Sequence, residues 1–251
     1  MLLFRWLTIL AVSLLLAQSA YADDSFDWTG PYAGFSVGPR AEDVDWETTN
    51  YQDPDGPSIP FESNPNASLD STDMTFNGFF GYNWLVSPKV LVGIDGNIAY
   101  ADNEDTRTSI PGAHDDPPDF SFVETETDWH GSLRGRLGYL ITPTIHLYTS
   151  AGLAIADTEQ TAVCPADTDF CNPAFGTIQA SESETMVGWT VGAGAEAAIT
   201  SRLFARLDYS YADYGSLDFD GLPAISNESY GFQSKSDYTS HTVTLGLAYK
   251  F

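Results

Sequence analysis

Hydrophobic and polar residues alternate along eight separate stretches of the chain, with the period of two that is typical of β-strands. In one stretch Val187, Trp189 and Val191 alternate with Thr190 and Gly192. We predict strands over 31–40, 72–84, 89–101, 128–140, 144–156, 185–199, 202–212 and 238–251. Every predicted strand is long enough to cross a bilayer at the usual tilt.

The segments between these strands are of two kinds. Short turn sequences lie at 85–89, 141–144 and 199–202. Long polar stretches lie at 41–71, 102–127, 157–184 and 213–237. Short turns at one end and long loops at the other are the layout of bacterial outer-membrane barrels, in which the turns are periplasmic. The sequence therefore predicts an all-β fold: an eight-stranded antiparallel up-and-down transmembrane β-barrel with long acidic extracellular loops.

The two faces of the predicted strands differ in a way that favours a barrel in lipid over a soluble sandwich. The apolar faces end in aromatic residues, as an interfacial girdle does; these include Trp84, Tyr100, Trp129, Tyr139 and Tyr249. The opposite faces are rich in glycine and other small residues, which fill a soluble core poorly but suit a narrow barrel interior. Closure also removes strand edges that lipid cannot solvate.

The first 22 residues have the pattern of a secretory signal peptide. Arg5 precedes an apolar run over 6–17, and small residues before Asp23 offer a cleavage site after Ala22. A membrane anchor is the alternative, but it needs about 20 apolar residues. We therefore expect a signal peptide at 1–22 and a barrel domain at 23–251. The mature chain has no other apolar run of spanning length, which excludes a helical membrane protein.

The charge balance narrows the range of partners. The chain has 35 acidic residues against 10 Lys and Arg, a net charge of −25, which argues against nucleic-acid binding. Most acids fall in the four long polar stretches. Solvated loops are the simpler interpretation, and weak, diffuse binding of divalent cations by carboxylates is the sharper one. No segment has the spacing of a dedicated calcium loop.

Two cysteines, Cys164 and Cys171, lie in one of the long polar stretches. A secreted chain meets an oxidising compartment, so we predict a short-loop disulfide between them. A metal pair is the alternative, but the spacing is wide and further His or Cys ligands are lacking nearby.

The four histidines raise the question of an enzyme. His114 lies beside acids in a loop, His130 lies at the end of a predicted strand, and His146 and His241 fall near opposite ends of the barrel. Catalysis needs a base, an orienting acid and a nucleophile or water within hydrogen-bond reach, and sequence adjacency does not supply that. We predict no catalytic residues, no cofactor and no dedicated metal site.

A group of charged residues falls on inward-facing strand positions at similar distances from the tight turns. A register centred on Ser201 places Glu196 opposite Arg206. Because a narrow barrel holds little water, we predict a balanced cluster that blocks the interior. Its members are Asp95, Arg134, Arg136, Glu196, Arg206 and Asp208.

Three segments resemble the porin-family or opacity-type outer-membrane β-barrel proteins of alphaproteobacteria. They are DWTGPYAG at 27–34, LDYSYADYG at 207–215 and HTVTLGLAYKF at 241–251. The resemblance covers the strands and leaves the loops unmatched. It implies a place in the cell outer membrane among lipid and lipopolysaccharide. It also implies insertion by the outer-membrane assembly machinery, with Leu247, Tyr249 and terminal Phe251 as the signal.

Members of that family are usually described as structural or surface proteins. We therefore expect a barrel that supports outer-membrane integrity and meets its surroundings through acidic loops. A small channel for ions and solutes is the alternative, and an outer-membrane enzyme is a weaker one. The long loops depart from the family pattern, so loop-borne functions do not carry over.

Overall fold

The computed structural model describes most of the predicted barrel domain. The described residues are 26–52, 58, 60–61, 64–108, 111–112, 122–164, 177–221 and 231–251. The predicted signal peptide, His114, Cys171 and the side chain of Cys164 lie outside them. The signal peptide and the disulfide therefore stay predictions.

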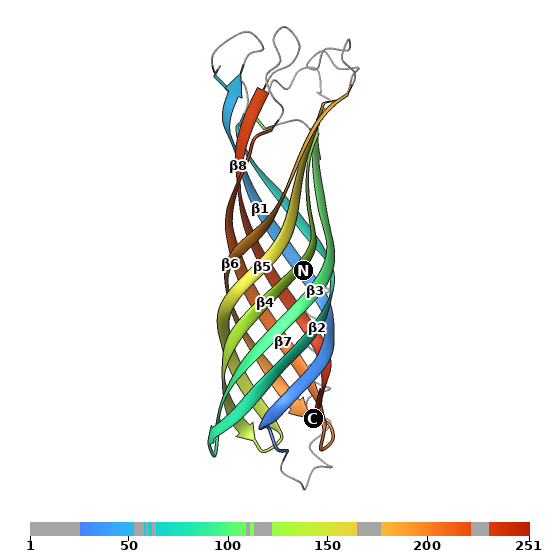
Figure 1. Ribbon diagram of the computed structural model, residues 1–251, viewed down its shortest axis with the longest axis vertical. Helices are drawn as coiled ribbons and strands as arrows, with labels where there is room; N and C mark the ends of the chain where they lie inside the picture. Colours follow the sequence, from blue (N-terminus) through green and yellow to red (C-terminus); the bar gives the residue numbers. More distant parts are fainter. Residues whose placement is uncertain are drawn as a thin grey trace.

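Eight antiparallel strands form one closed barrel in which each strand pairs with its neighbours in the sequence and β1 pairs with β8 (Figure 1). The strands are β1 (Gly30–Gln52), β2 (Asn66–Ser87), β3 (Val90–Thr108), β4 (Phe122–Thr142), β5 (Ile145–Cys164), β6 (Ile178–Ala198), β7 (Leu203–Phe219) and β8 (Gly231–Lys250). The predicted fold class is confirmed. No helix among the described residues is long and apolar enough to cross a membrane.

The strands are longer than the sequence pattern predicted, and the error lies at one end of each hairpin. Segments assigned to the long loops, such as most of 41–52 and 231–237, continue the sheet. The reason is visible in β1, where Val44 and Trp46 are buried while Asp45 and Glu47 point outward. Acids here occupy the solvent face of a strand, and the alternation continues through them.

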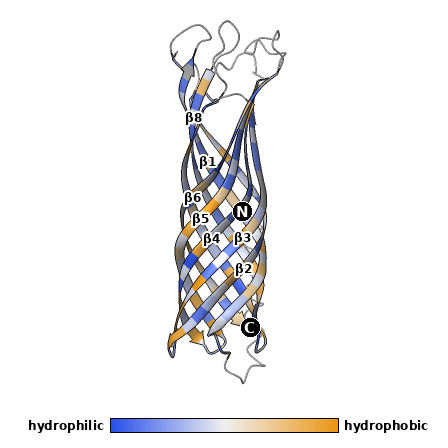
Figure 2. Cartoon of the chain, in the orientation of Figure 1, coloured by the Kyte–Doolittle hydropathy of each residue, from blue (hydrophilic) through white to orange (hydrophobic). Residues whose placement is uncertain are grey.

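The lower part of the barrel carries the surface that faces lipid. Large hydrophobic side chains are exposed there on every strand, and Figure 2 shows hydrophobic residues recurring along the lower half. Aromatic residues border this band, with Tyr100 and Trp189 above and Trp84 and Tyr139 below. A strand of 20 residues such as β8 rises about 50 Å at a tilt of about 40°, roughly twice the 25 Å of an apolar band. The upper half therefore stands outside the membrane.

The upper half is a sandwich of two sheets. The register of β2 with β3 ends at Phe76–Tyr100, and that of β6 with β7 ends at Trp189–Asp213, although all four strands continue beyond these pairs. Above these points β7, β8, β1 and β2 form one sheet, and β3, β4, β5 and β6 form the other. In Figure 1 the upper ends of β1 and β8 stand apart from that of β6. We call this part the head.

A hydrophobic core joins the two sheets of the head. Trp46 packs against Phe219 and Phe232, with ring centroids 6.3 Å apart in both cases. The other members come from both sheets and include Val44, Leu69, Val123, Ala162, Met186, Leu217 and Tyr238. In the lower half the apolar face of each strand points outward to lipid. In the head the apolar face points inward and forms a core like that of a soluble protein.

Candidate functional site

The lumen of the membrane-spanning part contains a cluster of buried charged side chains. Glycines on the inner face make room for it. A Cβ on Gly81 would overlap the hydroxyl of Tyr32, and a Cβ on Gly194 would overlap the ring of Tyr148. Small residues inside the barrel therefore make room for large polar side chains from the adjacent strand, since Tyr32 is in register with Gly81 and Tyr148 with Gly194.

The six charged residues predicted to point inward all lie in the lumen and form one alternating chain of ion pairs. Arg134 links Asp208, at 3.0 Å, to Asp95, at 2.9 Å. Arg206 then links Asp95, at 2.9 Å, to Glu196, at 2.7 Å. Arg136 follows, with its Nη2 2.6 Å from Glu196 and its Nη1 3.9 Å from Asp95. Three arginines and three carboxylates thus alternate across four strands.

The residues of these ion pairs are buried, so each charge depends on its protein partners for compensation. Asp95 and Glu196 have no exposed surface, and Arg206 is 2% exposed. The sequence register places Glu196 opposite Arg206, and the structure pairs the same two residues. We call the six residues the ion-pair chain.

Three further polar residues belong to this layer and were missed from the sequence. Tyr32 donates to Asp95 at 2.9 Å and accepts from Arg136. Tyr148 donates to Asp208, and its ring lies 3.8 Å from the Arg136 guanidinium carbon. His146 Nε2 lies 3.2 Å from Glu196. All three occupy inward positions by alternation, and that was the available signal.

An aromatic layer closes the lower mouth of the barrel. The segment before β1 folds into the mouth and buries Phe26 and Trp28. The Trp28 indole donates to the Pro143 carbonyl at 3.0 Å and packs edge-on against His146, with ring centroids 4.3 Å apart. Phe204 completes the layer. The ion-pair chain is therefore shielded from the periplasmic side.

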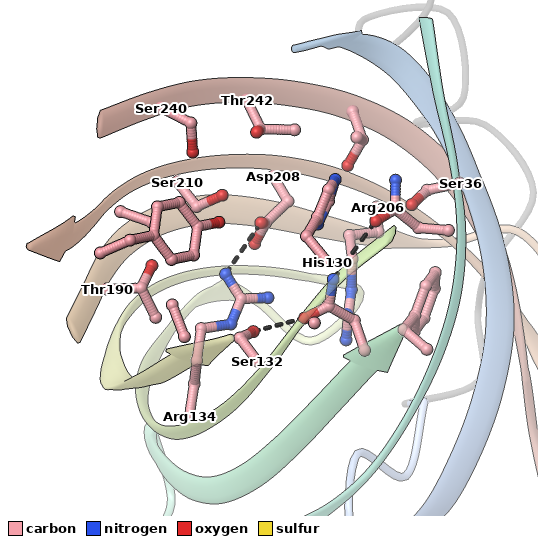
Figure 3. Close-up of a pocket in the computed structure, with 18 residues that line it drawn as sticks. Ser36, His130, Ser132, Arg134, Thr190, Arg206, Asp208, Ser210, Ser240 and Thr242 are labelled. Atoms are coloured by element: carbon pink, nitrogen blue, oxygen red, sulfur yellow. Dashed lines mark hydrogen bonds and ion pairs between the residues drawn. The ribbon is translucent and has the colours of Figure 1, made fainter. Parts of the chain in front are cut away.

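A small polar cavity lies above the ion-pair chain (Figure 3). Its volume is about 40 Å³. His130, Ser132, Arg134, Thr242 and Asp208 are among the residues that line it, and the Arg134–Asp208 pair spans one side. At about 10–15 Å³ for each water, the cavity holds roughly three molecules. Such a space suits ordered water.

Above the cavity, polar contacts lead into the head. Arg40 and Glu42 form a buried ion pair, and Thr127 donates to Glu42 at 2.8 Å. Gln160 donates to Tyr238 at 2.7 Å from the facing sheet. The hydrophobic core of the head begins at the same level, so the filled interior continues upward.

The residues predicted to act as the assembly signal lie on the outside of the barrel. Leu247, Tyr249 and Phe251 project outward near the lower rim, and Phe251 is 70% exposed. His241 also points outward and accepts or donates a hydrogen bond with the Tyr209 hydroxyl at 2.9 Å. In the part of the chain that is described, no group of three or more His, Cys, Asp or Glu residues is placed to hold a metal ion.

One titratable contact ties the segment before β1 to the end of β8. Lys250 Nζ lies 3.0 Å from Asp27, which also accepts from the Thr29 amide at 2.9 Å. Slight burial raises the pKa of Asp27, but these two hydrogen bonds and the Lys250 charge outweigh it and lower the pKa below its usual value. The contact helps to hold the Phe26–Trp28 segment against the last strand.

Comparison with known proteins gives consistent matches. A family model described as outer membrane protein beta-barrel domain matches residues 8–251. The 22 kDa outer membrane protein of Rhizobium leguminosarum bv. viciae is 34% identical over 173 residues, which is 69% of this chain and 64% of that protein. The chain thus spans just under two thirds of that relative.

Other matches are more distant in sequence. The 31 kDa outer-membrane immunogenic protein of Brucella melitensis biotype 1 is 29% identical over 94% of this chain and 88% of that protein. The crystal structure of the outer membrane protein OprG from Pseudomonas aeruginosa is similar with a TM-score of 0.49 and 12% identity, over 91% of this chain and 99% of that chain.

Proposed function

The chain belongs to the outer membrane protein beta-barrel domain family, and we propose that it serves as a closed structural barrel whose head meets the surroundings of the cell. The family membership confirms the resemblance found in the sequence and places the protein in the bacterial outer membrane. The relatives are named as outer-membrane proteins, and none of these names describes an enzyme.

The observation that carries the proposal is the continuous filling of the lumen. From the lower mouth upward, the described interior contains an aromatic layer, the ion-pair chain, a cavity of about 40 Å³ and the hydrophobic core of the head. An ion crossing this path would have to break buried ion pairs and then enter an apolar core. Both steps are unfavourable by several kcal/mol.

A small channel is the competing function, and electrical recording distinguishes the two. We expect purified, refolded protein in a planar bilayer to show no steady conductance and no solute uptake in liposome swelling. Arg134→Ala combined with Asp208→Ala enlarges the cavity but leaves both closing layers, so this variant should also stay silent. Steady conductance from the unaltered protein would overturn the proposal.

Assembly and lipid contact are the second part of the proposal. Outward-facing Leu247 and Tyr249 lie on β8 at the lower rim, and exposed Phe251 directly follows that strand, which supports the role of these residues as the signal for the outer-membrane assembly machinery. Phe251→Ser should therefore reduce the amount of folded protein in cells while leaving refolding in detergent unchanged. Equal amounts of folded variant and unaltered protein in cells would show that the assembly machinery does not recognise Phe251.

Weak, diffuse binding of divalent cations, without a dedicated metal site among the described residues, is proposed for the head. Glu104, Glu126 and Glu159 lie directly opposite one another on three adjacent strands and face solvent. Facing carboxylates repel, and hard divalent cations relieve that repulsion. Millimolar Mg²⁺ or Ca²⁺ should raise the urea midpoint more than NaCl of the same ionic strength. Equal effects would indicate simple screening.

A further inference from the structure

The seam between β6 and β7 leaves one long strand edge of the head without a described partner. β6 begins at Ile178, but its register with β7 ends at Trp189–Asp213. Among the described residues, 178–188 therefore pair with β5 alone. A strand edge of this kind presents a row of backbone N–H and C=O groups that can pair with another chain.

The separation of β6 from β7 is explained by an irregularity in β7. At its base the strands are tightly packed, because a Cβ on Gly188 would overlap the Asp213 carbonyl. Immediately above, the register of β7 with β8 shifts between Asp213 and Gly215. Gly215 has φ of 79°, and its amide donates to the Asp213 side chain at 2.9 Å. A bulge with a left-handed glycine bends β7 away from β6 and ends the pairing of these two strands, while the pairing of β7 with β8 continues.

The charges along the seam indicate what kind of strand suits this edge. Glu182 and Glu184 occupy the inward positions of β6, as buried Met186 does, yet both are exposed. Across the seam Asp218 and Asp220 are exposed as well, with Lys235 in register with Asp218. Glu182 and Glu184 are two residues apart, about 6.6 Å along the strand backbone, on one face.

We propose that the free edge of β6 binds an extended cationic peptide by strand addition, with basic residues at alternate positions beside Glu182 and Glu184. Backbone hydrogen bonds supply pairing, and the alternate side chains supply selection. A second copy of this chain fits less well, because each copy carries a net charge of −25 and would bring acids to acids.

The opposing interpretation is that the two glutamates only guard the edge against pairing, which is a known use of inward-pointing charges. Glu182 and Glu184 would disfavour the pairing of a neutral or acidic strand, but the basic residues of a cationic strand would neutralise them. The two interpretations therefore differ for one class of peptide. The free edge of β6 lies in the head and not in the lumen, so peptide binding and the absence of conductance can fail separately.

The probe is a synthetic peptide that alternates lysine with threonine or valine, added to refolded full-length protein in a non-ionic detergent. We expect saturable binding and slower hydrogen exchange at amides within 178–188. Glu182→Gln with Glu184→Gln should weaken binding by roughly three- to ten-fold, the value of two exposed ion pairs. Heat-modifiable migration on a gel checks that the variant is folded.

The matched control is Asp43→Asn with Asp45→Asn. These carboxylates have the same spacing on β1, but that strand is paired on both sides. The control variant should bind the peptide as the unaltered protein does. Equal weakening by both variants, or equal binding of a peptide N-methylated at alternate amides, would show electrostatic adsorption and overturn the proposal.

Two other results would also overturn it. One is binding without any change in exchange at 178–188. The other is protection of these amides in the absence of peptide together with a dimer in light scattering, which would make a second copy the occupant.

Discussion

Single side chains in the lumen depend on one another because little water is present to replace a lost partner. Arg206 contacts both Asp95 and Glu196, and Glu196 in turn contacts Arg136. Removing one member leaves a buried charge next to it uncompensated, whereas removing two oppositely charged neighbours restores balance.

This dependence predicts the outcome of a double-mutant cycle. Glu196→Ala should lower the free energy of unfolding by about 3–5 kcal/mol, because buried Arg206 loses a partner. Glu196→Ala combined with Arg206→Ala should lose less than the sum of the two single losses. Urea midpoints in detergent measure all three variants. Additive losses would show that the two residues act independently.

The predicted disulfide should have little effect on the stability of the barrel. A Cys164–Cys171 bridge would close a short loop at the upper end of β5, far from the ion-pair chain. Such a bridge restricts few unfolded conformations and stiffens the loop locally. Reduction should therefore leave the urea midpoint of the barrel nearly unchanged. Thiol labelling of protein from oxidised cells supplies the check, and free thiols there would contradict the bridge.

At the scale of strands, the sequence predicted what depends on local alternation and failed where distant pairing decides. The membrane-spanning halves and the two faces of β6 followed from the period of two. The acidic extensions were missed because polar composition was interpreted as loop. Residues 43–47, Asp-Val-Asp-Trp-Glu, already carry the alternation that places Val44 and Trp46 in the core of the head.

The division of the head into two sheets was beyond the sequence. It depends on where the β2–β3 and β6–β7 registers end, and the second depends on the bulge before Gly215. The contacts of Tyr32 and Tyr148 were equally hidden. Alternation places both inside, but the shear of the barrel decides which charged residue meets them at the same height.

The head offers a prediction about like charges on neighbouring strands. Glu126 faces Glu104 on β3 and Glu159 on β5. Glu126→Gln should raise the free energy of unfolding by a few tenths of a kcal/mol, because it removes both repulsions. Glu47→Gln is the matched control, since Glu47 faces Lys235 and the same change should not stabilise. A loss of stability in Glu126→Gln would contradict this account.

The same residue gives a dependence on pH. Burial and the surrounding carboxylates raise the pKa of Glu126, which lies in the head above the membrane. The folded protein therefore takes up a proton at higher pH than the unfolded chain does, and the repulsion disappears as the pH falls through the raised pKa. The advantage of Glu126→Gln should be present at pH 7 and shrink in that window. Urea midpoints of both proteins across the range provide the measurement.

On the scale of the whole molecule, two different solvents act on one continuous set of strands. In lipid, every backbone group must be paired within the sheet, so the lower half is closed. Above the membrane, water can solvate strand edges, and the same strands separate into two sheets around a hydrophobic core. The lower half is therefore a closed barrel, whereas the upper half can have strand edges that are exposed to water.

Closure predicts how the molecule loses its structure. Because the lower barrel has no edge strand from which to fray, it should resist dodecyl sulfate at room temperature and unfold only on heating. Unboiled protein should migrate on a gel as a compact species with β-sheet circular dichroism, and boiled protein should migrate differently. Glu196→Ala should need a lower temperature for the change, because three buried arginines would then face only two carboxylates. Equal migration before and after boiling, together with a helical spectrum, would contradict a closed barrel.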